Sequence, residues 1–121
     1  MQTFEIKGEE HELKLTLKAV QHLNGLYEGN AFGLIQRALT GDIDTYVEVV
    51  SAGLFHTEKG FKKSDVIKEV EQAIAAEKLD LDQMNRTCYA VVADSFFYKK
   101  TVEKMLSKDP KARKQIEELM K

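Results

Sequence analysis

The chain is poor in cysteine and proline and has no long apolar run, and each shortage narrows the classes of protein to consider. Its 121 residues contain one cysteine, Cys88, and one proline, Pro110. A single cysteine excludes an internal disulfide framework and is typical of a reducing compartment. No apolar run approaches the ~20 residues that a membrane-spanning helix needs. The first residues, 1–5, lack the basic start and apolar centre of a signal peptide. We therefore expect a cytoplasmic protein.

The sequence also lacks the residue spacings that commonly mark enzymes and metal sites. None of His11, His22 and His56 has a second ligand residue three or four positions later, as familiar metal motifs do. Cys88 falls on the apolar face of a predicted helix, where a thiol behaves as a small hydrophobic side chain. The carboxylates fall at predicted helix starts and solvent faces, and the glycines form no phosphate-binding loop. We expect no catalytic residue, no metal and no cofactor.

Positive charge is scarce until the C-terminal part of the chain. Residues 1–97 hold 10 Lys and Arg against 16 Asp and Glu, whereas residues 98–121 hold 8 against 4. The basic end has two interpretations: a surface for nucleic acid or an acidic protein, or solvated helices with cations toward the C-terminus, as the helix dipole favours. We favour solvated helices because acidic residues interrupt the basic run. A small regulatory or nucleic-acid-binding protein that uses these helices remains the alternative function.

Two short runs near the N-terminus alternate between apolar and polar residues. The first contains Phe4 and Ile6, and the second contains Leu13, Leu15 and Leu17. This period of two predicts a β-hairpin over residues 2–17 with one buried face. A two-stranded ribbon is marginally stable alone and leaves both edges unpaired. We expect it to lie on the helices, to pair with another chain, or both.

The rest of the chain has apolar residues at helical spacing, separated by caps and breakers. We predict an α+β protein that is mainly helical, with the hairpin followed by about five or six helices. Residues 1–108 should form one compact domain, and residues 109–121 a short amphipathic helix that can be loosely held. The predicted helices cover residues 18–27, 31–39, 43–56, 64–78, 81–108 and 110–121.

Three consecutive aromatic residues, Phe96, Phe97 and Tyr98, lie within the long predicted helix over residues 81–108. Three successive helical residues span about 200° of the helix circumference, so one buried stripe cannot cover all three side chains. Either neighbouring elements cover this helix on two sides, or an aromatic side chain is left for a partner. The sequence leaves both possibilities open.

The order of the hairpin and the following helix caps resembles a known family. The relevant segments are residues 4–8, 12–19, 33–35, 39–42 and 52–54, with Leu23, Val50 and His56. Together they resemble the first part of the tail assembly chaperones of long-tailed phages that infect Gram-positive bacteria. There a hairpin with a glycine turn leads into a helix, and a Gly-Asp corner separates two later helices. The resemblance covers about residues 2–75.

The resemblance implies a non-enzymatic protein in the cytoplasm of the bacterial host. It would bind the long, apolar, helical tape measure protein, keep it soluble and help to recruit tail tube subunits. Self-association is a further expectation, whereas a membrane or nucleic acid is not expected as a partner. We hypothesise that the partner or self-association surface is lined by Phe97, Tyr98, Ile116, Leu119 and Met120. The open edges of the hairpin offer a second contact surface.

Overall fold

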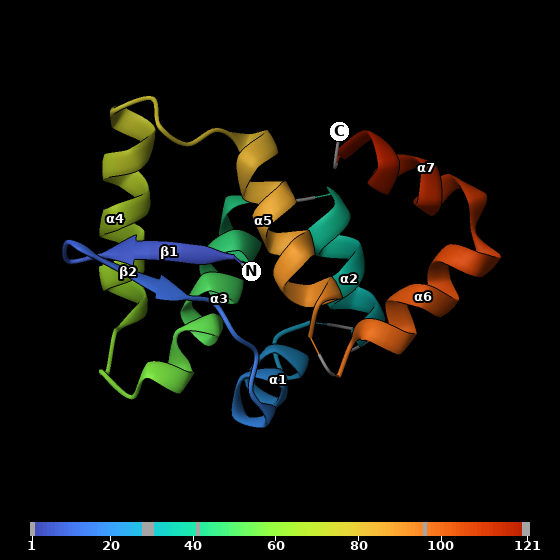
Figure 1. Cartoon of the computed structure of the whole chain (residues 1–121), viewed down its shortest axis with the longest axis horizontal. Helices are drawn as coiled ribbons and strands as arrows, with labels where there is room; N and C mark the ends of the chain where they lie inside the picture. Colours follow the sequence, from blue (N-terminus) through green and yellow to red (C-terminus); the bar gives the residue numbers. More distant parts are fainter. Residues whose placement is uncertain (1, 28–30, 41, 96, 120–121) are drawn as a thin grey trace.

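The computed structural model describes residues 2–27, 31–40, 42–95 and 97–119, and these form a hairpin followed by helices (Figure 1). The mainly helical α+β fold predicted from the sequence is confirmed. The described part contains seven α-helices and one short 3-10 helix. The elements are β1 (Thr3–Ile6), β2 (Glu9–Glu12), α1 (Leu17–Asn24), α2 (Ala31–Thr40), α3 (Ile43–Gly53), η1 (Phe55–Thr57), α4 (Lys63–Ala75), α5 (Leu81–Ala93), α6 (Lys99–Lys108) and α7 (Pro110–Leu119).

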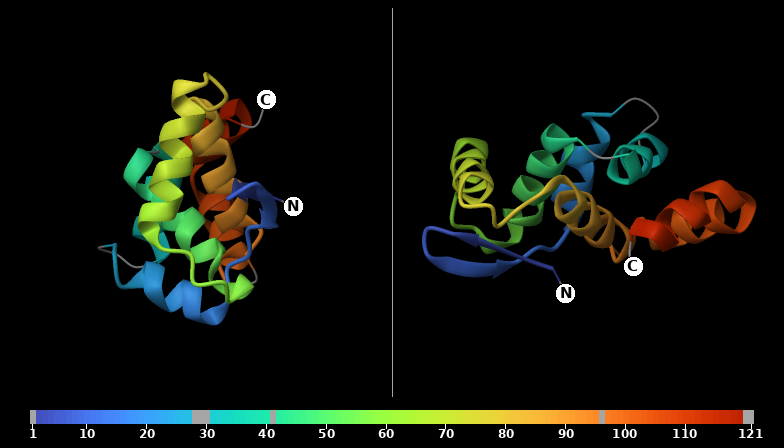
Figure 2. Two further views of the ribbon diagram at one scale, coloured as in Figure 1. Left: turned by 90° about the vertical axis from the view of Figure 1, so that its left-hand side faces the viewer. Right: turned by 90° about the horizontal axis from the view of Figure 1, so that it is seen from above.

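The elements form an elongated molecule with α3 and α5 near its middle. The hairpin and α4 lie at one end, and α6 and α7 lie at the other (Figures 1 and 2). Helix α3 contacts α1, α4 and α5, while α2 packs on α5. The two ends are therefore attached to a shared helical centre.

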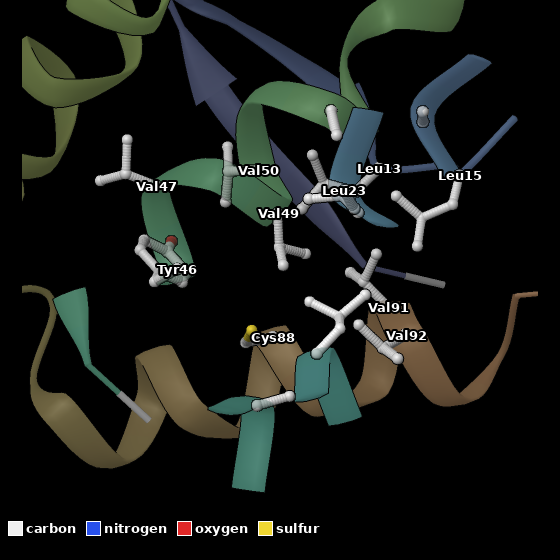
Figure 3. Close-up of a cluster of buried hydrophobic side chains, with 14 of the residues drawn as sticks. Leu13, Leu15, Leu23, Tyr46, Val47, Val49, Val50, Cys88, Val91 and Val92 are labelled. Carbon is white, nitrogen blue, oxygen red and sulfur yellow. The ribbon is translucent and has the colours of Figure 1, made fainter. Parts of the chain in front are cut away.

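The core lies between α3, α5, α1 and the segment after β2 (Figure 3). Burial raises the pKa of the Cys88 thiol to about 12, so this group stays protonated and serves as packing, as predicted. The buried side chains labelled in Figure 3 are Leu13, Leu15, Leu23, Tyr46, Val47, Val49, Val50, Cys88, Val91 and Val92.

The hairpin is shorter than the sequence pattern predicts. The turn is the two residues Lys7 and Gly8, both with positive φ (52° and 82°), which suits the tight turns that join twisted strands. The paired ladder ends at Glu12, opposite Thr3. Leu13 and Leu15 are buried as expected, but Leu17 begins α1 and is 59% exposed. The alternation stops there because Thr16 caps the helix and accepts a hydrogen bond from the Ala19 amide.

The single helix predicted over residues 81–108 is wrong, because α5 ends at Ala93 and α6 begins at Lys99. Ser95 explains part of the break, since its hydroxyl accepts the Phe97 amide at 3.3 Å and so competes with helical hydrogen bonding. Tyr98 explains another part, because its side chain is fully buried. Phe96, the first of the three consecutive aromatic residues, lies outside the described residues.

Aspartates begin several helices, as predicted. Asp42 accepts the Thr45 amide at 2.7 Å, and Asp80 accepts the Gln83 amide at 2.8 Å. Asp109 accepts the amides of residues 111 and 112 and is followed by Pro110 at the first position of α7. These bonds satisfy amides that a helix start leaves unpaired. The bonds to Asp109 also fix the corner between α6 and α7.

Candidate partner-binding surfaces

The structure separates the neighbouring aromatic residues Phe97 and Tyr98. Phe97 is 45% exposed, whereas Tyr98 is 0% exposed. The Tyr98 hydroxyl donates a hydrogen bond to Asn24 Oδ1 at 2.8 Å, and the two aromatic rings meet edge to face at 5.3 Å. Burial raises the pKa of Tyr98 to about 12. Tyr98 therefore anchors the turn from inside, and of this pair only Phe97 presents an aromatic surface to a partner.

The other hypothesised surface residues belong to the last part of the chain. Ile116 is partly buried and packs against the core, while α7 contacts both α5 and α6. The side chain of Leu119 and the whole of Met120 lie outside the described structure. The turn that carries Phe97 follows the C-terminal end of α5, whereas the end of α7 lies toward the other end of α5 (Figures 1 and 2). Of the hypothesised residues, the structure describes the side chains of Phe97, Tyr98 and Ile116, and a shared binding surface remains a prediction.

Helices α6 and α7 carry seven exposed cationic side chains, interspersed with exposed carboxylates. The cationic residues are Lys99, Lys100, Lys104, Lys108, Lys111, Arg113 and Lys114. None of these seven side chains forms an ion pair with another residue in the described ranges. Their charge is available to an acidic partner. Sequence reasoning identified this charge imbalance but not the turn that separates it from α5.

The two edges of the hairpin differ. On the β2 edge, His56 Nε2 donates to the Glu12 carbonyl oxygen at 2.6 Å, and the Lys14 amide donates to the Gly53 carbonyl at 3.0 Å. Lys59 adds an ion pair to Glu9 at 3.0 Å. The end of α3 and the chain around η1 therefore cover this edge at Glu12 and Lys14. The sequence pattern, which predicts two open edges, contains no signal for these contacts.

The β1 edge remains largely open. The register places Ile6 opposite Glu9, and these residues flank the two-residue turn, so Thr3, Glu5 and Lys7 direct their backbone groups away from β2. The Lys7 amide donates to Glu69 Oε1 of α4 at 3.0 Å. Within the described structure, the outward N–H and C=O groups of Thr3 and Glu5 have no hydrogen-bond partner.

A hollow of about 440 Å³ adjoins this open edge, with α3, α4 and the start of the α4–α5 connection around it. Apolar and aromatic side chains contribute to its lining, with carboxylates at Glu5 and Glu69 and a cation at Lys78. Tyr46 of α3 contributes to its lining and is only 4% exposed. An open strand edge beside a partly apolar hollow can accept a protein segment.

The described residues show no arrangement for metal chemistry and no membrane span. No group of three His, Cys, Asp or Glu side chains among them could hold a metal ion. His11 and His22 each face a carboxylate, Glu9 at 3.6 Å and Glu48 at 3.5 Å. No helix in the described ranges is long and apolar enough to cross a bilayer.

Exposed aromatic, cationic and strand-edge surfaces on a helical domain are features of a protein that binds other proteins. The model of the phage tail assembly chaperone (TAC) family matches residues 3–107. The chain therefore belongs to the phage tail assembly chaperone family, which is a non-enzymatic family. The match extends the resemblance seen in residues 2–75 into the end of α6 and leaves out α7. No curated protein and no solved structure matches the chain.

Proposed function

We propose that this tail assembly chaperone binds the tape measure protein in the cytoplasm of the bacterial host, keeps it soluble and supports assembly of the tail tube. The family match over residues 3–107 carries the proposal. A long apolar helical protein requires its apolar faces to be covered until they are assembled. The chaperone offers exposed apolar side chains on a stable helical frame for this purpose.

We propose that Phe97 makes the main contact with the tape measure protein. It is about half exposed, and its backbone is held by the Ser95 hydroxyl on one side and the buried Tyr98 on the other. A large aromatic side chain on a fixed backbone loses little conformational entropy on binding, and aromatic residues often dominate binding energy at interfaces. Ile116 and Leu119 of α7 are the further proposed contacts.

The test is co-purification of the tape measure protein of the same phage with chaperone variants. Phe97→Ser should lower the co-purified amount at least tenfold, because interface aromatic residues often contribute more than about 2 kcal/mol to binding. Adding Leu119→Ser should lower it further. Ile67→Ser is the matched control, since Ile67 is 37% exposed on α4 at the other end of the molecule (Figure 1).

The possible outcomes distinguish an incorrect contact residue from an incorrect function. Unchanged co-purification of Phe97→Ser would reject Phe97 as a contact while leaving the function in place. A wild-type chaperone that neither co-purifies with the tape measure protein nor increases its soluble fraction would reject the proposed function. Far-UV circular dichroism of each variant checks that the fold is kept.

A further inference from the structure

We infer that the open edge of β1 takes an extended segment of the partner as a third strand, and that this segment alternates apolar and basic residues. The inference rests on the proposed function, since it names the tape measure protein as the partner. It assigns the contact to Thr3, Glu5 and the adjacent hollow, away from the surface around Phe97.

The backbone of β1 provides the hydrogen bonds. Thr3 and Glu5 each direct one N–H and one C=O group away from β2, and these groups have no partner among the residues described. The register of the hairpin fixes their direction, because backbone groups in an antiparallel ladder point alternately toward and away from the neighbouring strand. A strand added at this edge would pair with all four groups.

The hollow accommodates the inward side chains of such a strand. Phe4 and Tyr46 are almost fully buried beside it, and Ala73 and Leu79 are partly exposed. Apolar side chains of small or medium size fit this lining.

The carboxylates near β1 favour basic side chains on the outward face of the added strand. Glu5 lies directly opposite Glu10 in the register, where side chains approach closely and like charges are destabilising. Neither carboxylate forms an ion pair within the described residues. Glu69 adds a second carboxylate at the hollow, against one cation, Lys78. A lysine or arginine opposite Glu5 on the added strand would offset this repulsion, so the segment should be basic.

The experiment compares proline substitutions on the two edges of the hairpin. Glu5→Pro removes an outward N–H of β1 and places a ring at the open edge, whereas Glu10→Pro does the same on β2. Proline is tolerated at outward positions of edge strands. Co-purification of the tape measure protein should fall at least tenfold for Glu5→Pro and change less than twofold for Glu10→Pro. Equal binding by both variants and the wild type would overturn the inference.

Two further measurements keep the inference testable if Glu5→Pro folds poorly. Glu5→Lys should weaken binding about threefold, since exposed charge pairs contribute modestly, and Glu10→Lys should weaken it less. In the wild-type complex, the Glu5 amide should exchange its hydrogen at least tenfold more slowly than in the free chaperone. Unchanged exchange in a complex that does form would reject strand addition and leave the proposed function intact. Absence of any wild-type complex would instead reject the function itself.

Discussion

The hairpin at one end of the molecule and the α6–α7 pair at the other are attached to the same helical centre in different ways. The hairpin buries Phe4 and Ile6 in the core, and hydrogen bonds and one ion pair from α4, the end of α3 and the chain around η1 fix its orientation. Burial of Tyr98, Val102 and Ala112 holds the α6–α7 pair. One side-chain hydrogen bond, from the Tyr98 hydroxyl to Asn24, adds to this attachment. Directional contacts fix the orientation of the hairpin edges. In contrast, one buried aromatic residue, Tyr98, fixes the position of the turn between α5 and α6.

The largest effect should come from removing that aromatic residue. Tyr98→Ala should lower the free energy of unfolding by about 3–5 kcal/mol, as for other large aromatic side chains truncated in a core. Phe97→Ala is the matched control, because truncating this half-exposed neighbour should cost about 1 kcal/mol or less. Urea unfolding measures both values. Similar losses of unfolding free energy for the two variants would show that the turn between α5 and α6 does not depend on Tyr98.

A smaller effect is expected from the contact that covers the β2 edge. His56→Ala removes the donor to the Glu12 carbonyl oxygen and should cost about 1 kcal/mol. Lys59→Ala removes an exposed ion pair with Glu9 and should cost less than His56→Ala, because solvent screens such pairs. Thermal unfolding compares the two variants. A larger loss for Lys59→Ala would mean that side-chain charge, and not the backbone hydrogen bond, holds this edge.

The smallest effect concerns Asp42, which caps α3, the central helix behind the hairpin. The Thr45 amide, aided by Arg37, lowers the pKa of the Asp42 carboxyl against the effect of burial. A lowered folded-state pKa gives stability above the unfolded value of about 3.9 that is lost as the pH falls through the folded-state pKa. Because the side chain is partly exposed and solvent screens its charge, Asp42→Asn should be less stable by only about 0.3–1 kcal/mol at pH 7. The difference should vanish in acid.

Thermal unfolding of Asp42→Asn and the wild type between pH 7 and pH 2 tests this prediction. The stability difference should be constant down to about pH 4 and should shrink below it. Asp44→Asn serves as the control in the first turn of the same helix. A difference that persists at pH 2 would show that the introduced amide fits the cap poorly for reasons other than charge.

Local signals in the sequence predicted most of the fold. The alternation around Phe4 and Ile6 identified β1, and the cap residues Asp80 and Asp109 located helix starts, because these features depend on neighbours within a few residues. The break between the end of α5 and the start of α6 is not predicted, because no glycine or proline marks it. Its causes are the Ser95 side chain and the burial of Tyr98 against α1, and burial of that kind cannot be recognised from helical spacing.

The candidate surfaces were predicted less completely than the fold. The aromatic run left two possibilities open, and periodicity could not show that Phe97 is half exposed while Tyr98 is buried. The hairpin suggests two open edges, yet His56, 44 positions away from Glu12, covers the end of one of them. Contacts over such separations depend on tertiary packing, which no local pattern encodes.

The contacts that hold the hairpin also impose an order on its assembly during synthesis. The strands emerge from the ribosome before the groups that hold them, since the Lys7 amide binds a residue 62 positions downstream. Because translation proceeds at roughly 5–20 residues per second, the hairpin must wait several seconds for α3 and α4 before it can dock. During that interval a newly made chain exposes Phe4 and Ile6, so the early part of translation is a period of risk for aggregation.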